Sequence, residues 1–476
     1  MKRFIEGADR NQVMLLPESV EDYVGADNPV RIVEAFVEQL DLREMGFEGT
    51  DPLATGRPAY HPSIMLKIYV YGYLNRIQSS RRLEHETQRN VELMWLTGRL
   101  TPDFKTIANF RKDNGRAIRK VCRQFIILCR QLNLFTRTLV AIDGSKFKAV
   151  NNRDKNFTDA KMKRRMAQVN ESIERYLRAM DSADRAEPEV AELKRGRLQE
   201  KIDALKQQME KLKDIDARMR ASPDKQVSLT DPDARSMKNR EGGIVGYNVQ
   251  VAVDAEHHLI VAHEVTNDGL DRDQLSSMAG KAKEAVGATE LTVVADRGYF
   301  KSEEILECTQ SGISPLVPKS MTSNSLAAGR FDKQDFIYIA EDDEYRCPAG
   351  QRAIWRFRTV EDGLTIDKYW SSACPRCPMK AQCTTGKYRR ITRWKHEAVL
   401  EAMQERLDRK PDSMRVRRRT VEHPFGTLKF WMGAVHFLTK TLPRVSAEMS
   451  LHVLAYNLKR VMQILGIGEM LRVLRA

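Results

Sequence analysis

Three acidic residues stand where a metal site for phosphate chemistry could be built. Asp143 ends the apolar run Thr138-Leu-Val-Ala-Ile, Asp296 ends Glu290-Leu-Thr-Val-Val-Ala, and Glu422 lies in a basic, helix-forming stretch. Hard ions such as Mg²⁺ prefer carboxylate ligands, and two such ions about 3.5–4 Å apart can activate water and stabilise the leaving oxygen of a phosphodiester. These residues could therefore support metal-dependent phosphoryl transfer.

The two aspartates follow similar segments. Both runs are short, apolar and rich in β-branched residues, which predicts two buried strands whose carboxylates meet if the strands share a sheet. Taken singly, either aspartate could merely cap a change from strand to turn, as in Asp143-Gly144-Ser145.

The third acid belongs to a spaced triple, R-x3-E-x6-K, made by Arg418, Glu422 and Lys429. On one helix Arg418 and Glu422 share a face, and Lys429 falls about two turns beyond on nearly the same side. A carboxylate flanked by two cations suits a phosphate. A solvated helix face would give the same pattern, and Pro424 could kink or start the helix.

Four cysteines form a second candidate metal site. Cys347 precedes Cys374, Cys377 and Cys383, and four thiolates are the number that a closed tetrahedral zinc site needs. One C-x2-C is less specific than two, so reduced thiols without a ligand remain the alternative.

Composition points to a polyanionic partner. The 476 residues include 79 Lys and Arg against 65 Asp and Glu, a formal net charge of +14. This favours nucleic acid, although a solvated basic surface or an acidic protein gives the same balance. Residues 1–9 lack the apolar core of a secretory signal, and no run reaches the ~20 apolar residues of a membrane span. We therefore expect a cytoplasmic protein without a membrane partner.

Helical periodicity covers residues 30–134. Within it, 79–88, 91–96 and 103–112 predict the outline of a helix-turn-helix, with Lys105 and Arg111 facing DNA, although plain three-helix packing fits equally well. Further on, Arg389, Arg390, Arg393 and Lys395, together with the run from Arg415 to Arg419, would suit a groove that follows a DNA backbone, or else form a solvated face.

The remaining segments alternate between strand and helix patterns. Residues 161–219 predict an antiparallel helical hairpin or an oligomerising coiled coil. Strands are expected at 244–253 and 259–265, a helix at 273–286, and a helix pair at 445–472 that is broken at Gly466-Ile-Gly468. Residues 300–400 show no clear period.

Several of these motifs together resemble a known family. Ala-Ile-Asp143-Gly-Ser, Val-Ala-Asp296-Arg-Gly-Tyr and the R-x3-E-x6-K triple are similar to the DDE transposases of bacterial insertion sequences. The stretch from Arg57 to Lys67 resembles their helical DNA-binding domain, and Leu454-Ala-Tyr-Asn-Leu-Lys459 resembles their closing helix. Many relatives carry a Tyr three residues before the signature Arg, where this chain has Arg415, which puts that Tyr's role in doubt.

The resemblance implies a fold, a site and a reaction. The fold is α/β, α+β overall, with an RNase H-like mixed sheet flanked by helices. Asp143, Asp296 and Glu422 would hold two Mg²⁺ or Mn²⁺ ions, and Arg418 and Lys429 would contact the phosphates of the transposon ends. The enzyme would bind terminal inverted repeats, cleave double-stranded DNA to release a 3′-hydroxyl and join it to target DNA. Synapsis of two ends would involve a homodimer at the nucleoid.

The expected domains follow from these assignments. They are a helical DNA-binding domain at 1–134, an RNase H-like core at 135–160 and 221–300, a helical hairpin insert at 161–220, a subdomain with a possible zinc site at 301–400, and the C-terminal part of the core at 401–476. Two other functions remain open. A non-catalytic, zinc-stabilised DNA-binding regulator would share the charge and the cysteines, and a structure-selective nuclease would cut without recognising particular ends.

Overall fold

The computed structural model describes residues 19–52, 54–55, 58–183, 188–222, 224–239, 242–319 and 324–475. Two parts of the sequence interpretation lie outside the described residues. They are residues 1–9, which were considered for a secretory signal, and Arg57, the first residue of the stretch that resembles a DNA-binding domain. Within the described part of the chain, no helix is long and apolar enough to cross a membrane.

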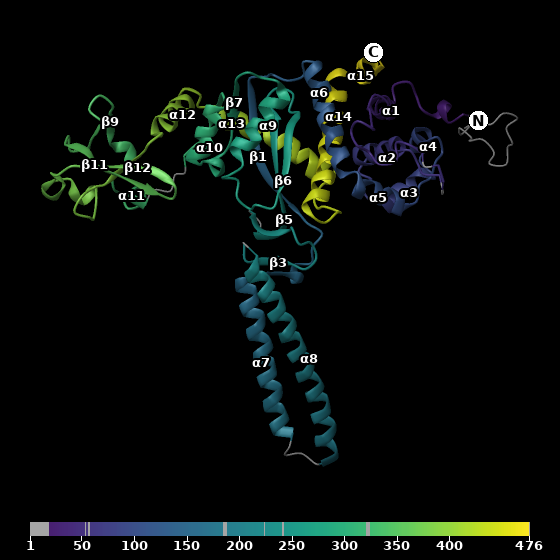
Figure 1. The fold of residues 1–476 in the computed structure, drawn as a ribbon, viewed down its shortest axis with the longest axis horizontal. Coiled ribbons are helices and arrows are strands. Elements are labelled where there is room, and N and C mark those ends of the chain that lie inside the picture. Colours follow the sequence, from purple (N-terminus) through teal and green to yellow (C-terminus); the bar gives the residue numbers. More distant parts are fainter. Residues whose placement is uncertain are drawn as a thin grey trace, which may run out of the picture.

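A six-stranded mixed sheet forms the centre of the molecule (Figure 1). Its strands are β1 (Leu139–Lys148), β4 (Arg235–Asn239), β5 (Gly242–Asp254), β6 (Ile260–Thr266), β7 (Leu291–Val294) and β8 (Ile313–Leu316). The spatial order is β6-β5-β1-β7-β8, with β4 pairing the first part of β5. β6 and β1 each pair with β5 in the antiparallel direction, whereas β7 pairs with both β1 and β8 in the parallel direction. This is the RNase H-like arrangement, so the expected fold class is confirmed.

Helices cover both faces of this sheet. On α9 (Leu275–Val286), Lys281 forms a salt bridge with Glu264 of β6. Glu264 pairs with Gln250 of β5, so the two side chains lie on the same face of the sheet. On α14 (Leu442–Leu465), Ser450 contacts His263, which stands opposite Val251 on the other face. Because alternate residues of a strand point to opposite faces, α14 lies on the face that carries Asp143, and α9 covers the reverse side.

The N-terminal helices join the same core. They are α1 (Val30–Glu38), α2 (Pro62–Leu74), α3 (Ser80–Thr87), α4 (Val91–Thr97), α5 (Phe104–Asp113) and α6 (Gly115–Gln131). Helix α14 packs against α6, α2 and α5, and Phe36, Phe125, Val251 and Leu454 belong to one buried cluster. The helical character and the three short helices α3 to α5 agree with the sequence expectation. Among the described residues, the buried side chains of these helices and of the central sheet form one continuous core.

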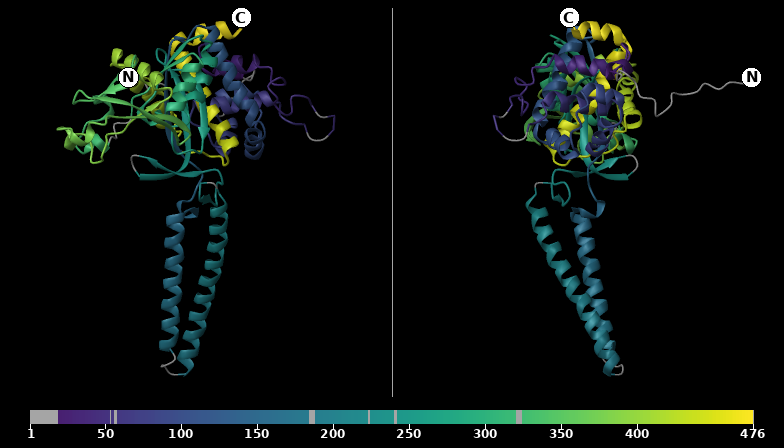
Figure 2. Two further views of the ribbon diagram at one scale, coloured as in Figure 1. Left: turned by 60° about the vertical axis from the view of Figure 1, so that its left-hand side comes forward. Right: turned by 90° about the vertical axis from the view of Figure 1, so that its right-hand side faces the viewer.

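A long helical hairpin projects away from the body of the molecule (Figures 1 and 2). It consists of α7 (Asp159–Ala183) and α8 (Pro188–Ala221), which pack against each other through Met162, Val169 and Met209. The short pair β2 (Asn156–Thr158) and β3 (Gln226–Ser228) closes its base. Of the two sequence interpretations, the antiparallel hairpin is therefore the one that the fold contains.

A second, five-stranded sheet lies to one side of the central sheet (Figure 1). Its strands are β9 (Ile337–Ile339), β10 (Glu344–Arg346), β11 (Arg352–Glu361), β12 (Leu364–Trp370) and β13 (Ile391–Trp394). The expected boundary of this subdomain at residue 301 needs correction, because α10 (Ser302–Gln310) and β8 precede it and β8 pairs with β7 of the central sheet. The second sheet, with α11 (Asn324–Ala327), is followed by α12 (Glu397–Arg409) and α13 (Ser413–Gly426).

The C-terminal helix pair agrees with its sequence pattern. Helix α14 ends at Leu465, Gly466 follows with φ 79°, and α15 (Ile467–Arg475) begins at once. This positive φ is a conformation that glycine adopts without strain, so the glycine provides the break between the two helices.

Candidate active site

Asp143 lies in the middle of β1 rather than at its end. The strand continues to Lys148, and Gly144 pairs with Gln250 of β5. The turn expected at Gly144-Ser145 is therefore wrong. A Cβ atom at Gly144 would lie 2.4 Å from Gln250 Nε2 and 2.6 Å from Asp271 Oδ1, so glycine is needed here for a close approach and not for a turn.

Asp296 follows the end of β7 after one residue, Ala295, close to where the sequence predicts it. It caps a short 3₁₀ turn, where its Oδ1 accepts a hydrogen bond from Gly298 N at 2.8 Å. In the parallel pair of β1 and β7, Ala141 stands opposite Val294. Two residues further along each chain, Asp143 and Asp296 therefore lie next to each other, although most of the core separates them in sequence.

One arginine contacts both aspartates. Arg417 Nη2 lies 2.5 Å from Asp143 Oδ1 and 3.4 Å from Asp296 Oδ2. The side chains of Arg417 and Asp143 are 15% and 21% exposed, and that of Asp296 is 45% exposed. Arg417 could not be singled out from the sequence, because four arginines within the five positions 415–419 offer no local signal for which of them faces inward.

The surroundings of Asp143 disfavour its charged form. Burial raises the pKa of this carboxyl from 3.8 to about 6, with Arg417 opposing the change and the neighbouring Asp296 and Asp271 adding to it. A low-dielectric site with a second carboxylate nearby destabilises an isolated negative charge. Asp143 is therefore an acid whose ionisation depends on the cation beside it.

Glu422 does not join the two aspartates in this structure. It is exposed on α13, whereas its neighbours Val421 and Phe425 are buried. Five residues separate it from Arg417, which at 3.6 residues per turn places it roughly 140° further around the helix. Among the described residues, no three His, Cys, Asp or Glu side chains are grouped so as to hold a metal ion.

The end of α13 places Lys429 beside β1. The helix continues through Pro424 to Gly426 and then changes to a π-helical turn, Thr427–Trp431. Lys429 Nζ donates to Ser145 Oγ at 2.6 Å and lies 4.6 Å from the centre of the Phe147 ring. Asp143, Ser145 and Phe147 alternate along one face of β1, so this cation approaches the aspartates on their own face.

The other basic residues of α13 face solvent. Arg418 is exposed, and Arg415 is exposed with a salt bridge to Asp412 at 3.1 Å. Both are accessible to a large partner. Their assignment to DNA phosphates stays a prediction.

Asp271 is a third acid near β1 that the sequence did not suggest. Its Oδ1 accepts hydrogen bonds from Asn248 Nδ2 and Gln250 Nε2, both at 2.7 Å, and lies 3.4 Å from Lys146 Nζ. These partners stand on the face of the sheet opposite Asp143, because Gln250 pairs with Gly144. Asp271 therefore acts on Asp143 through its charge across the strand, without sharing a ligand position.

Lys105 and Arg111, which were both expected to contact DNA, differ in their exposure to solvent. Lys105 is exposed on α5 and remains a candidate. Arg111 is only 7% exposed: its Nη1 donates to Tyr73 Oη at 2.7 Å, and its guanidinium lies 5.4 Å from the centre of the Tyr69 ring. The expectation for Arg111 is therefore corrected, since the helix turns this residue into the core between α2 and α14.

Some residues of the predicted basic groove make contacts within the protein and are not free to face DNA. Arg389 donates to Phe331 O at 3.0 Å, Arg393 pairs with Glu401 at 2.5 Å, and Trp394 is buried. Of the four basic residues between 389 and 395, Arg390 and Lys395 are the two that are exposed in the described structure.

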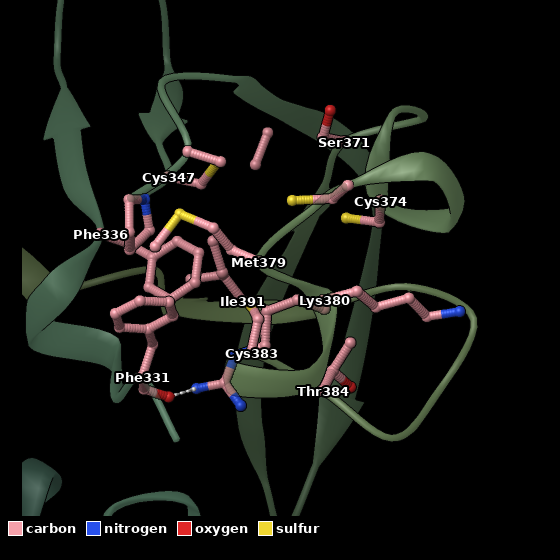
Figure 3. Close-up of a pocket in the computed structure, with 15 residues that line it drawn as sticks. Phe331, Phe336, Cys347, Ser371, Cys374, Met379, Lys380, Cys383, Thr384 and Ile391 are labelled. Carbon is pink, nitrogen blue, oxygen red and sulfur yellow. Dashed lines mark hydrogen bonds between the residues drawn. The ribbon is translucent and has the colours of Figure 1, made fainter. Parts of the chain in front are cut away.

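The four cysteines of the second sheet line one pocket (Figure 3). None forms a disulfide, and each is half-buried. Burial raises the pKa of the Cys383 thiol and Arg389 opposes this, while the neighbouring Cys374, Cys347 and Cys377 of the same pocket raise it further. As placed, however, they are not among any metal-holding group in the described residues, so the structure brings the thiols to one pocket without assembling a coordination sphere.

Comparisons with known proteins match two parts of the chain. The family described as Transposase domain (DUF772) matches residues 18–113, which include the helices α1 to α5. The family described as Transposase DDE domain matches residues 346–462, which include α13 with Arg417 and Glu422, and Lys429 beyond it.

No curated protein matches the chain. A cryo-EM structure of the piggyBac transposase synaptic complex with hairpin DNA covers 95% of this chain and 79% of its own, at 9% identity and a TM-score of 0.30.

Proposed function

The chain belongs to the DDE transposases of insertion sequences, and on this premise we propose that it binds the terminal inverted repeats of its element and cleaves and joins DNA strands at Asp143 and Asp296. The observation that carries the proposal is the meeting of these two carboxylates around one positive group, Arg417. Carboxylates that share a cation in a partly buried site are suitable ligands for a divalent ion.

The chain's own residues have distinct parts in this proposal. Asp143 and Asp296 would hold two Mg²⁺ or Mn²⁺ ions, which when bound supply an activated water and stabilise charge on the leaving oxygen. Arg417 would leave the carboxylates and become available to a phosphate. Lys429, beside Ser145, and the exposed Arg418 and Arg415 would position the DNA backbone.

Glu422 would complete the ligand set only after a movement of α13. Glu422 is exposed and belongs to no metal-holding group among the described residues. The π-helical turn that follows the helix is a place where the backbone can change its winding. We propose that binding of metal and DNA turns α13 so that Glu422 replaces Arg417. Two copies would act together in a synaptic homodimer at the nucleoid, with Lys105 contributing to DNA binding.

Nicking of a duplex that carries the inverted repeat flanking the reading frame tests the proposal. Asp143→Asn, Asp296→Asn and Glu422→Gln should each reduce Mg²⁺- or Mn²⁺-dependent nicking at least about 100-fold, because each removes a ligand, and should leave binding of the repeat intact. Glu405→Gln, an exposed Glu on α12 paired with Arg409, is the matched control and should cut like the wild type. Wild-type rates in either aspartate variant would remove that residue from the mechanism.

One observation favours the rival function. The outward position of Glu422 is what a non-catalytic DNA-binding regulator would tolerate, since such a protein has no use for a third ligand. If the wild-type protein binds the repeat but never nicks it with either ion, the regulator is the correct assignment. If it nicks branched DNA irrespective of end sequence, a structure-selective nuclease is.

We also propose that Cys347, Cys374, Cys377 and Cys383 bind one structural Zn²⁺. The support is that four free thiols line one pocket in a subdomain whose own buried cluster is small, comprising Phe336, Tyr345, Ala353, Tyr369 and Ile391. The side chains would have to close by rotation to reach a tetrahedral ion.

Metal analysis of protein purified without chelator tests this site. About one zinc per chain is expected for the wild type, with loss of the metal in Cys374→Ser and in Cys383→Ser. The buried Cys308, which lies outside the pocket, provides the control variant Cys308→Ala with unchanged zinc. Absence of zinc in wild-type protein would leave these residues as reduced thiols.

A further inference from the structure

Large apolar side chains are presented to solvent immediately after Lys429. Within the segment 430–438, which we name the aromatic loop, Phe430 is 82%, Trp431 67%, Val435 58% and Leu438 38% exposed. Single exposed apolar residues are ordinary, but several in one short segment mark a binding surface.

The backbone of the aromatic loop is held firmly. Arg76 Nη2 donates to Phe430 O at 3.2 Å, and Gln78 Nε2 donates to Met432 O at 2.8 Å. At the other end, Phe437 N donates to Lys148 O at 2.9 Å, and the buried Glu448 accepts from Leu438 N at 2.8 Å.

Buried side chains alternate with the exposed ones in this loop. Met432, Ala434 and Phe437 are 1–2% exposed and anchor the loop in the core. Phe430 and Trp431 are therefore displayed on an ordered support, so that binding a partner does not have to order this backbone first.

The loop lies beside the candidate active site and in positive surroundings. Lys429 contacts Ser145, two residues along β1 from Asp143, a separation of roughly 7 Å at about 3.3 Å per residue. The segment 427–440 contains Lys429, His436 and Lys440 and no Asp or Glu. Arg76 adds a further exposed cation at Phe430.

These features select one class of occupant. Flat aromatic rings suit the faces of nucleobases, and the neighbouring cations suit phosphates, so together they fit nucleic acid with bases that are not fully stacked. A purely apolar partner would gain nothing from the cations. We propose that Phe430 and Trp431 stack on bases of the DNA end next to the scissile phosphate; this proposal rests on the proposed function.

Fluorescence of a base analogue tests the stacking directly. A duplex ending in the inverted repeat, with 2-aminopurine placed at successive positions around the cleavage site, is bound by the full-length protein in EDTA so that no cutting occurs. We expect a change in 2-aminopurine fluorescence at one or two adjacent positions. Trp431→Phe should retain it, whereas Trp431→Leu, which is apolar but lacks a ring, should lose it.

Binding and oligomeric state separate the alternatives. The double variant Phe430→Ala/Trp431→Ala should bind the end roughly 10- to 100-fold more weakly, with an unchanged unfolding temperature and no change in sedimentation of the free protein. Val360→Ala, at an exposed apolar residue on β11 outside the aromatic loop, serves as the control and should keep the fluorescence change.

Three results would overturn the proposal. Equal fluorescence in Trp431→Leu and wild type would exclude stacking by Trp431, and equal fluorescence in the double variant would exclude stacking by both rings. A dimer that dissociates in the double variant, with DNA binding intact, would identify the loop as an interface between copies. Wild-type protein that shows no preference for the repeat would refute the proposed function itself, which is a different outcome from a specific binder without a stacking signal.

Discussion

Replacing Asp143 by Asn is expected to make the metal-free protein more stable at neutral pH. In the fold, burial first and then Asp296 and Asp271 raise the pKa of Asp143 from 3.8 to about 6, against the effect of Arg417. A difference of about 2 pKa units corresponds to about 3 kcal/mol, at roughly 1.4 kcal/mol per unit, by which folding disfavours the ionised group. The amide removes that charge and keeps the shape of the side chain.

The sign of the pH dependence follows from the two pKa values. Because the folded-state pKa lies above the unfolded one, the folded protein holds the proton more tightly, and stability falls as pH rises from about 4 to about 6. The penalty is complete above that window. The advantage of Asp143→Asn should therefore be on the order of 2–3 kcal/mol at neutral pH and should shrink toward zero as the pH approaches 4.

Urea and thermal unfolding of both proteins in EDTA, at a series of pH values, measure this difference. The control is Asp254→Asn, because Asp254 is fully buried and accepts hydrogen bonds from Thr136 N at 2.9 Å and His257 N at 2.8 Å. That variant should be less stable than wild type at every pH tested. If Asp143→Asn also unfolds more easily than wild type at neutral pH, the Asp143 side chain stabilises the fold. The inference that burial disfavours its charged form in the metal-free protein is then refuted.

Three further predictions follow from individual contacts. Gly144→Ala should lower the thermal unfolding midpoint, with a cost of about 1–3 kcal/mol, because its Cβ would meet Gln250 and Asp271 at less than 3 Å; an unchanged midpoint would show that the strands can separate there. Arg111→Met should destabilise the protein by about 2–3 kcal/mol through loss of a buried charged hydrogen bond, whereas Lys105→Ala should leave unfolding unchanged and weaken binding of the repeat in a filter-binding assay. Arg417→Ala removes the cation beside Asp143 and should raise the pKa of that carboxyl further, so the pH of half-maximal nicking should move upward; a profile identical to wild type would contradict the coupling.

Much of the local structure could be predicted from the sequence. The short apolar runs before Asp143 and Asp296 became β1 and β7, the alternation at 244–253 became β5, and the helix pair around Gly466 formed as expected. These patterns are readable because a strand or helix repeats its buried positions at a fixed period. Asp143 was placed correctly on its strand but wrongly at its end, because a Gly that serves close packing looks the same in sequence as a Gly that serves a turn.

Only part of the candidate site could be predicted from the sequence. The sequence singled out Asp143, Asp296, Glu422 and Lys429, and the structure unites the two aspartates and sets Lys429 beside them. It turns Arg417 inward in place of Glu422. Which side of α13 faces the sheet depends on the residues that pack there, namely Val421 and Phe425. The arginines at 415–419 are alike in sequence and therefore do not indicate which of them will point toward the aspartates.

The amino-acid sequence by itself determined the residue types available for chemistry and the elements with a clear period, such as β1, β5, β7 and the hairpin α7–α8, because these patterns depend on near neighbours in the chain. It did not determine the strands of the second sheet, which lie in the segment without a clear period. Only the tertiary structure decided that β8 belongs to the central sheet, that Arg111 is buried, that Asp271 acts on Asp143 from the opposite face of the sheet, and that Lys429, which precedes the aromatic loop, contacts Ser145 on β1. Each of these depends on contacts between segments far apart in sequence, where burial and charge are set by the partner and not by the local pattern.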